Sequence, residues 1–486
     1  MIENIHKDLE ALALRGLEVI GGEGVAVAIV KDGEVILAEG YGYADRDNEI
    51  PMTADTAMPI GSSSKAFTST GVMMLASEGK LDIDRPVREY MPRFNLDDPA
   101  AYAVTTRDML CHRTGLPRHD LLWITWPDVE RDDLIYNRLE HLKANKPFRT
   151  KWEYNNHMFA AAGKLIEELS GISWEEFTKE RIFAPLGMTS SFFWQDERPD
   201  IKQSVLYKDE DGKRVPCKTE RVPALGPAGS IRSTVTDMAQ WLKFNLARGK
   251  VSDEALLDDA SFKQLWEPNI NYQLLPFKVP EIMTIGYGLG WFIDAYRGEL
   301  RVEHGGNVTG ASAEVCMLPE KNVGVVVLTN QNSTVLGYVL VSQIMDLLLE
   351  RECDTDWLMF WKTEFEKMKT KQEQDFATLR ATVPDKPMTH DGAEYEGEYE
   401  HPGYGAISVC YDGDAENKLA MDIHGTVHPL IHMHYDVFRA EIQDIPIPVI
   451  FRTGADGSIS AVDIHMEMSL PEMISYKRVP RTEGIG

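Results

Sequence analysis

Segments typical of β-strands lie at both ends of the first 350 residues, and most of the sequence between them has helical patterns. Near the start, the apolar segments 25–30 and 34–38 flank Asp32-Gly33, a strong signal for a two-residue hairpin turn. The segments 313–318 and 323–328 form a second hairpin pattern. One antiparallel sheet built from both ends of this stretch and covered by helices satisfies the pattern. The sequence therefore predicts an α/β (α+β) fold with a helical subdomain at roughly 85–285.

The pattern changes after this stretch. Residues 355–382 form a charged helical segment with an apolar stripe, and residues 382–387 contain two prolines typical of a linker. Short alternating segments follow from 394 to 477, separated by turn signals such as Asp456-Gly457. We therefore expect one domain over 1–352, a helix and linker over 353–390, and a small antiparallel β-barrel over 391–480.

Length, charge and cysteine content restrict the class of protein. A chain of 486 residues is too long for one ordinary domain, and its net charge of −27 argues against a nucleic-acid or anionic-membrane surface. No apolar run reaches transmembrane length, and the first residues lack the basic start and apolar core of a signal peptide. The five cysteines, Cys353 among them, form no Cys-x-x-Cys pair, so neither a disulfide framework nor a zinc ribbon is indicated. These features predict a cytoplasmic protein without membrane or nucleic-acid partners.

The stretch with the most chemical content is Ile60 to Phe67, in which Ser62 precedes Lys65 by three residues. If a helix begins near Ser62, the two side chains share one face of it. A serine nucleophile needs an adjacent base, and a lysine amine becomes one when burial or nearby positive charge lowers its pKa. A helix N-terminus also offers free backbone N–H groups to a developing oxyanion.

Ser-x-x-Lys is a short pattern that also occurs by chance. The chain contains a second copy, from Ser77 to Lys80, at a position where a helix should end with Gly79 after it. We interpret that copy as a helix terminus, and the interpretation of Ser62 therefore depends on other motifs.

Three short motifs follow one another along the chain. They are Ser62-x-x-Lys65, Tyr154-x-Asn156 and His304-x-Gly306, with flanking stretches at 112–117, 185–189 and 287–291. In this order and spacing the chain resembles the serine β-lactamase / D,D-peptidase superfamily over roughly residues 10–350. It is most similar to the class C β-lactamase-like branch of esterases, peptidases and acyltransferases. The resemblance implies a β-lactamase/transpeptidase-like fold.

The resemblance also implies a role for each motif residue. Ser62 would attack a carbonyl, and Lys65 and Tyr154 would share the proton transfers, with the choice of general base left open. Asn156 would orient the lysine and hold the acyl side of the substrate. The backbone N–H groups of Ser62 and of Asn307, which follows the glycine motif, would form the oxyanion hole.

One position departs from the pattern of β-lactamases and cell-wall peptidases, which usually carry lysine where this chain has His304. A permanent cation there favours a substrate carboxylate, whereas histidine can be neutral at pH 7. The departure favours the esterase, D-aminopeptidase and acyltransferase branches. Aromatic residues surround the motifs in sequence, and Trp152, two residues before Tyr154, is the preferred candidate for lining the substrate pocket.

Two functions stay open at this point. The first is a serine hydrolase or acyltransferase that forms an acyl-enzyme with a small ester, amide or thioester and needs no cofactor. The second is a non-catalytic binding or scaffold protein that keeps the fold. An α/β-hydrolase is disfavoured because the chain has no Gly-x-Ser-x-Gly.

The C-terminal segment resembles the lipocalin-like domain appended to some of these enzymes, on the stretches 395–399, 402–405 and 432–438. Such barrels support assembly or restrict access to the site, so a homo-oligomer is compatible with this sequence. The histidines His424, His428, His432 and His434 raise the question of a metal site. Strand spacing places residues i and i+4 too far apart for a compact ligand set, so we expect no metal.

Overall fold

A computed structural model describes residues 2–210, 212–252, 254–351, 355–383, 385–413 and 419–480; Cys353 and Pro384 lie outside the described residues. Its central element is one antiparallel sheet of eight strands. In spatial order these are β11 (Ile282–Tyr287), β12 (Phe292–Tyr296), β13 (Glu299–Val308), β14 (Ala311–Leu318), β15 (Val323–Thr329), β1 (Gly24–Lys31), β2 (Glu34–Asp45) and β3 (Ile50–Pro51).

The two ends of the first domain meet inside this sheet. Strand β1 pairs with β15, with Val27 opposite Val327, and with β2 across the Asp32-Gly33 turn. Both residues of that turn have positive φ, +52° and +82°, as a type I′ hairpin turn requires. The prediction of a single sheet built from both chain ends is confirmed.

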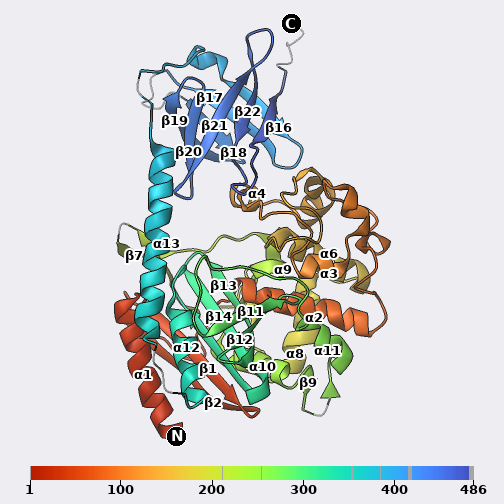
Figure 1. Cartoon of the computed structure of the whole chain (residues 1–486), viewed down its shortest axis with the longest axis vertical. Helices are drawn as coiled ribbons and strands as arrows, with labels where there is room; N and C mark the ends of the chain where they lie inside the picture. The colour runs from red at the N-terminus through yellow and green to blue at the C-terminus, as the bar shows by residue number, and fades with distance from the viewer. Residues whose placement is uncertain are drawn as a thin grey trace.

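Helices cover both faces of the sheet (Figure 1). Alternate residues of β1 point to opposite faces, so that Val25 packs toward α1 (Ile2–Val19) and α12 (Leu336–Leu348), whereas Ala26 packs into the larger core. That larger core joins the sheet to a mainly helical region. Its longer helices are α2 (Ser64–Ser77), α6 (Asn156–Ser170), α10 (Val235–Leu246) and α11 (Asp259–Leu265). Its shorter helices are α3 (Thr106–Leu110), α4 (Asp120–Thr125), α5 (Arg131–Asp133), α7 (Trp174–Thr178), α8 (Ala184–Leu186) and α9 (Gly226–Gly229).

Small sheets complete this region. They pair β4 (Met58–Pro59) with β8 (Ile231–Ser233) and β5 (Phe192–Phe193), β6 (Leu206–Glu210) with β7 (Lys213–Cys217), and β9 (Lys250–Val251) with β10 (Glu254–Ala255).

Two local details position the motifs. Residues 287–293 form the end of β11, a turn and the start of β12, where Gly290 adopts φ +77° and packs beside the Lys65 backbone. Strand β13 extends through His304 to Val308. The extension matters because it carries the glycine motif against the Ser62 turn.

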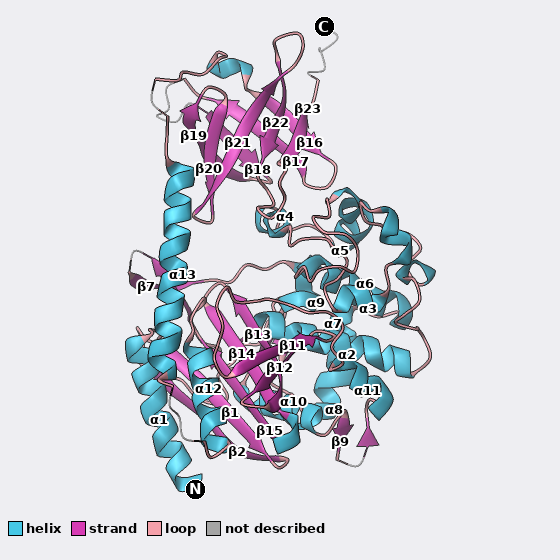
Figure 2. Ribbon diagram, viewed as in Figure 1, coloured by secondary structure: helices cyan, strands magenta, loops and turns pink. Residues whose placement is uncertain are grey.

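A long helix, α13 (Trp357–Arg380), leads from the sheet to a closed antiparallel barrel, as Figures 1 and 2 show. The barrel strands are β16 (Gly397–His401), β17 (Gly405–Tyr411), β18 (Leu419–Ile423), β19 (Thr426–His434), β20 (Val437–Ile442), β21 (Ile445–Thr453), β22 (Ile459–Ile464) and β23 (Ile474–Arg478). The prediction of a small all-β unit is confirmed as a closed eight-stranded barrel. Its likeness to a lipocalin and the exact domain boundaries stay predictions.

Within the described residues, no helix is both long and apolar enough to cross a membrane. The described cysteines, Cys111, Cys217, Cys316 and Cys410, are all free thiols.

Candidate active site

Ser62 and Lys65 occupy the turn that begins helix α2. Ser62 lies in a short 3₁₀ turn (Gly61–Ser63), and Lys65 lies in the first turn of the α-helix that continues it. The lysine Nζ lies 3.0 Å from the serine Oγ. The three-residue spacing thus brings amine and hydroxyl into hydrogen-bond contact.

Two further groups hold the Lys65 amine. It donates to Asn156 Oδ1 at 2.8 Å and to the backbone carbonyl of Ala228 at 2.9 Å. Both are acceptors only, so they use the two N–H bonds of a neutral amine and leave its lone pair for Ser62. Burial lowers the pKa of Lys65 well below its ordinary value, and the nearby Arg118 cation lowers it further. The arrangement suits a neutral amine that accepts the serine proton.

Asp120 fixes the orientation of the Asn156 amide. Asn156 Nδ2 donates to Asp120 Oδ1 at 3.1 Å, and this carboxylate also accepts from Trp123 Nε1 at 2.9 Å. A carboxylate cannot donate, so the amide oxygen of Asn156 must face Lys65. Arg118 pairs with the other carboxylate oxygen at 2.5 Å. The sequence motifs did not point to Arg118 or Asp120, and no local spacing signal marks them.

Tyr154 lies just before α6, whose N-terminus is capped by Asn155 through a bond from Met158 N–H at 2.9 Å. The Lys65 Nζ is 4.8 Å and the Arg118 Cζ 5.0 Å from the Tyr154 ring centroid. Burial raises the pKa of the phenol to about 12, although its hydrogen bond with Ser62 and the Arg118 charge act in the opposite direction. Tyr154 is therefore protonated at neutral pH.

The glycine motif approaches the Ser62 turn very closely. A Cβ atom on Gly306 would lie 1.9 Å from the Ile60 carbonyl oxygen and 2.8 Å from the Ser62 nitrogen. A Cβ atom on Gly61, which has φ +49°, would lie 2.8 Å from the Asn307 nitrogen. The backbone nitrogens of Ser62 and Asn307 are thus on facing segments, as an oxyanion hole requires. The Asn307 side chain points elsewhere and accepts from Ser312 Oγ at 2.8 Å.

His304 is buried, with 2 % of its surface exposed. Its Nδ1 donates to the Gly305 carbonyl at 2.6 Å, so its Nε2 carries no proton and accepts from the Tyr287 hydroxyl at 3.1 Å. Burial lowers its pKa to about 3. His304 is therefore a neutral, fully bonded group in place of a cation.

Trp152 lies in a cluster of aromatic rings beside the motifs. Its ring centroid is 5.7 Å from that of Tyr154, 5.9 Å from Tyr287 and 6.0 Å from Phe292. Its buried Nε1 has no hydrogen-bond partner among the described residues. The cluster packs apolar rings beside Tyr154, with Tyr287 and Phe292 buried, and it contains one N–H donor without a described partner.

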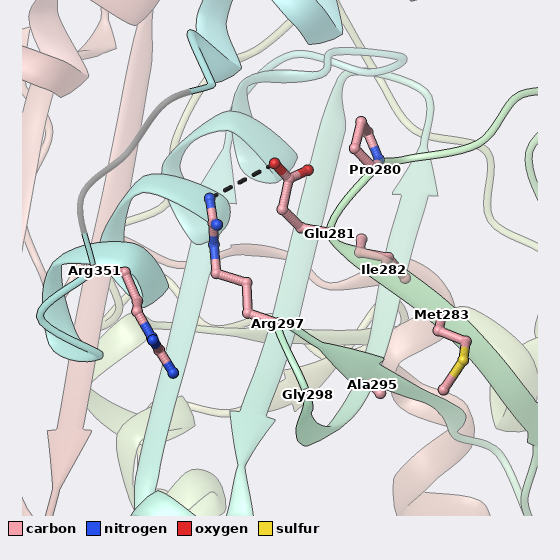
Figure 3. Close-up of a pocket in the computed structure, with 8 residues that line it drawn as sticks. All are labelled: Pro280, Glu281, Ile282, Met283, Ala295, Arg297, Gly298 and Arg351. Carbon is pink, nitrogen blue, oxygen red and sulfur yellow. Dashed lines mark ion pairs between the residues drawn. The ribbon is translucent and has the colours of Figure 1, made fainter.

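A separate pocket of about 530 Å³ lies beside the β11 edge of the sheet (Figure 3). Its lining residues are Pro280, Glu281, Ile282, Met283, Ala295, Arg297, Gly298 and Arg351. Arg297 pairs with Glu281 at 3.7 Å and with Asp346 at 2.6 Å, so its charge is already matched. This pocket holds none of the motif residues.

Three of the four barrel histidines considered for a metal site use a ring nitrogen on a backbone carbonyl. His424 bonds Tyr404, His428 bonds Glu441 and His432 bonds Tyr435, at 3.0, 3.1 and 2.9 Å. The described residues contain no group of three or more His, Cys, Asp or Glu suited to hold a metal ion.

Known proteins share both parts of this structure. An unguisins hydrolase, ungD′, of Aspergillus campestris is 29% identical over 92% of this chain and 87% of its own. The octameric penicillin-binding protein homologue from Pyrococcus abyssi covers 97% of this chain and 100% of its own, at 24% identity and a TM-score of 0.63. D-amino acid amidase from Ochrobactrum anthropi covers 72% of this chain and 100% of its own, at 21% identity and a TM-score of 0.60.

Two family models match the sequence. Residues 381–475 match a domain of unknown function, DUF3471, which spans the barrel. Residues 15–342 match the model described as Beta-lactamase, which spans the sheet, the helical region and all three motifs. The chain therefore belongs to the Beta-lactamase family.

Proposed function

We propose that this chain is a serine hydrolase in which Ser62 attacks the carbonyl carbon of a small ester or amide and Lys65 takes the serine proton. The observation that carries the proposal is the Lys65 amine, 3.0 Å from Ser62 Oγ, with both N–H bonds of its neutral form directed at Asn156 and Ala228. This favours Lys65 over Tyr154 as the base for acylation, since Tyr154 has its pKa raised to about 12.

The reaction has two steps. In the first, the bond from Ser62 Oγ to the carbonyl carbon forms, the bond to the leaving group breaks, and the proton held by Lys65 passes to the leaving group. The backbone N–H groups of Ser62 and Asn307 stabilise the negative oxygen. In the second step, water attacks the acyl-enzyme, and Ser62 recovers its proton as the acid product leaves. Tyr154, hydrogen-bonded to Ser62, is placed to relay protons in both steps.

The substrate class follows from charge and apolar surface. Neutral His304 offers no cation to a substrate carboxylate at the position where β-lactam and cell-wall enzymes have lysine. The aromatic cluster around Trp152 packs against Tyr154, and we propose that Trp152 lines the acyl side of the site, which favours an apolar acyl group. The name of the unguisins hydrolase supports hydrolysis, and the name of the D-amino acid amidase supports amide bonds as substrates. We therefore propose uncharged apolar amides and esters, including D-amino-acid amides.

The test is covalent labelling of Ser62 by a fluorophosphonate, followed by intact mass. We expect one adduct on wild type and on Ser77→Ala, which alters the second Ser-x-x-Lys copy and serves as the matched control. Ser62→Ala and Lys65→Met should give none, whereas Tyr154→Phe should label more slowly. Equal labelling of wild type and Ser62→Ala would leave the non-catalytic scaffold as the better explanation. Faster labelling of Lys65→Met than of Tyr154→Phe would make Tyr154 the base.

A second assay, product analysis, separates hydrolysis from acyl transfer. Wild type is incubated with a panel of p-nitrophenyl esters, thioesters and D-amino-acid amides, with and without an added alcohol or amine. Free acid as the main product supports the hydrolase; a product that carries the added alcohol or amine makes the chain an acyltransferase. Light scattering of the purified chain tests the homo-oligomer, which the octameric relative supports.

A further inference from the structure

The barrel contacts the catalytic region at the start of α4, which both ribbon views show below the barrel (Figures 1 and 2). His119, the residue before this helix, is buried with 0 % exposed surface. Its backbone N–H donates to Glu467 Oε2 at 2.6 Å, and its ring Nδ1 lies 2.7 Å from the Tyr404 hydroxyl. Both partners belong to the C-terminal barrel segment, so the barrel holds His119 at backbone and side chain.

The bonding pattern of His119 is fixed by its third partner. The ring Nε2 lies 2.9 Å from the backbone carbonyl of Lys143. A carbonyl only accepts, so the ring proton is on Nε2 and Nδ1 accepts from the Tyr404 hydroxyl. Burial lowers the pKa of His119, which agrees with this neutral state.

The backbone at His119 is in the left-handed region, with φ +47°. A residue with a Cβ atom disfavours this conformation, so the surrounding contacts must maintain it. The Glu467 contact is well suited to this, because its other oxygen, Oε1, accepts from the Ser469 N–H at 2.9 Å and hydroxyl at 2.7 Å. The carboxylate therefore links a barrel loop to the turn at His119.

The two neighbours of His119 reach the catalytic residues. Arg118 places its guanidinium over the Tyr154 ring, and Asp120 accepts from the Asn156 amide that holds Lys65. Both charges lie near Lys65 and Tyr154, and they influence the pKa of each. A rotation of the turn at His119 would displace Arg118 and Asp120 together.

We infer that the barrel is a positioning unit for catalysis: Tyr404 and Glu467 hold His119 so that Arg118 and Asp120 keep the Asn156 amide and the local charge in their working arrangement. The inference rests on the proposed serine hydrolase function and assigns a role to the barrel beyond assembly or restriction of access. Tyr404 and Glu467 are positioning residues that act through the 118–120 turn.

The interface offers a matched control. Lys143 pairs with Glu472 at 3.0 Å across the same interface, and both side chains are at least half exposed. Glu472→Gln makes the same chemical change as Glu467→Gln at a side-chain ion pair that does not include His119, which bonds Lys143 through its backbone carbonyl. Tyr404→Phe removes one hydroxyl from a buried ring.

The experiment measures fluorophosphonate labelling rate and kcat/KM for a p-nitrophenyl ester from pH 5 to 10, with near-ultraviolet circular dichroism as a check of folding. In Tyr404→Phe and Glu467→Gln we expect the labelling rate to fall about fivefold to tenfold, which is the effect of one lost buried hydrogen bond. We also expect the acid limb of kcat/KM to move in both variants. Glu472→Gln should stay within about twofold of wild type.

The outcomes separate the two proposals. If wild type labels no faster than Ser62→Ala, the serine hydrolase fails. If wild type labels but Tyr404→Phe and Glu467→Gln match Glu472→Gln at every pH, the positioning role fails. A parallel loss at all pH values with an unmoved acid limb also overturns it, because that is the result of a merely structural contact. Should Glu467→Gln not fold, the milder Tyr404→Phe decides.

Discussion

Arg118 provides a direct test of how the site keeps its base neutral. Its guanidinium and the Lys65 amine contact the same Tyr154 ring, at 5.0 and 4.8 Å from the centroid, so the two groups lie within about 10 Å of each other. At this separation and an effective dielectric constant of about 20, two unit charges repel by about 1.7 kcal/mol, or about one pKa unit.

Two corrections act on this magnitude in opposite directions. The Arg118 side chain is 53% exposed, so solvent screens part of its charge. Removal of the arginine also leaves Asp120 without its cation, and that carboxylate favours a protonated lysine. We therefore keep about one unit as the expected rise of the Lys65 pKa in Arg118→Met.

The sign of the effect follows from the role of the amine. In the proposed mechanism Lys65 is active when neutral, so a higher pKa leaves it protonated and inactive over a wider acidic range. The acid limb of kcat/KM in Arg118→Met should move upward by about one pH unit, with about tenfold loss on the acidic side and little change on the alkaline plateau. Arg118→Lys keeps the charge and is the control.

The assay is the pH dependence of kcat/KM for p-nitrophenyl butyrate, a substrate that does not itself titrate. A limb that stays in place in Arg118→Met, or activity that falls equally at all pH values, would refute the electrostatic reasoning. The second result would mean that Arg118 contacts substrate or supports the fold instead of tuning the base.

Three further outcomes follow from other contacts. Gly306→Ala should lower kcat by at least about a hundredfold, because the new Cβ would lie 1.9 Å from the Ile60 carbonyl oxygen and push the oxyanion donors apart. An unchanged kcat would contradict the close approach. Asp108→Ala should lower the free energy of unfolding by about 3–5 kcal/mol, since the buried carboxylate pairs with Arg113 at 2.6 Å and Arg149 at 2.7 Å. A urea titration that shows a loss of less than about 1 kcal/mol would refute this prediction. Burial lowers the pKa of His157 to about 4 and of His304 to about 3. Each histidine should therefore lower the free energy of unfolding by about 1.4 kcal/mol per pH unit as the pH falls below 6.5, because only the unfolded chain binds the proton there. A denaturant midpoint that stays the same from pH 6.5 to 4.5 would contradict this.

The parts of the fold that follow from local sequence were predicted well. The Asp32-Gly33 turn and the alternating barrel segments encode hairpins within a few residues. The contact of Ser62 with Lys65 is likewise a consequence of helical spacing. The place of Tyr154 and His304 came from resemblance, because nothing local brings segments 90 and 240 residues away to the same turn.

The Arg118–Asp120 pair shows where sequence reasoning stops. Neither residue has a spacing signal, and their effect on the site depends on a left-handed turn that a distant barrel holds through Glu467. The aromatic residues illustrate the same limit. Trp152 packs beside Tyr154, whereas Trp126 stacks on the barrel residue His424 at 4.1 Å, although both flank the motifs in sequence.

A consequence for catalysis follows from the protonation states together. Lys65, Tyr154 and His304 are all buried groups whose environments favour the neutral form near pH 7. The charged groups beside them are Arg118 and Asp120, and these sit on the turn that the barrel holds. The pKa values of three neutral buried groups should respond strongly to a displacement of Arg118 or Asp120, because a low-dielectric site screens these charges weakly. If the barrel positions the 118–120 turn as we infer, it acts on the two charges that influence the pKa values of Lys65 and Tyr154.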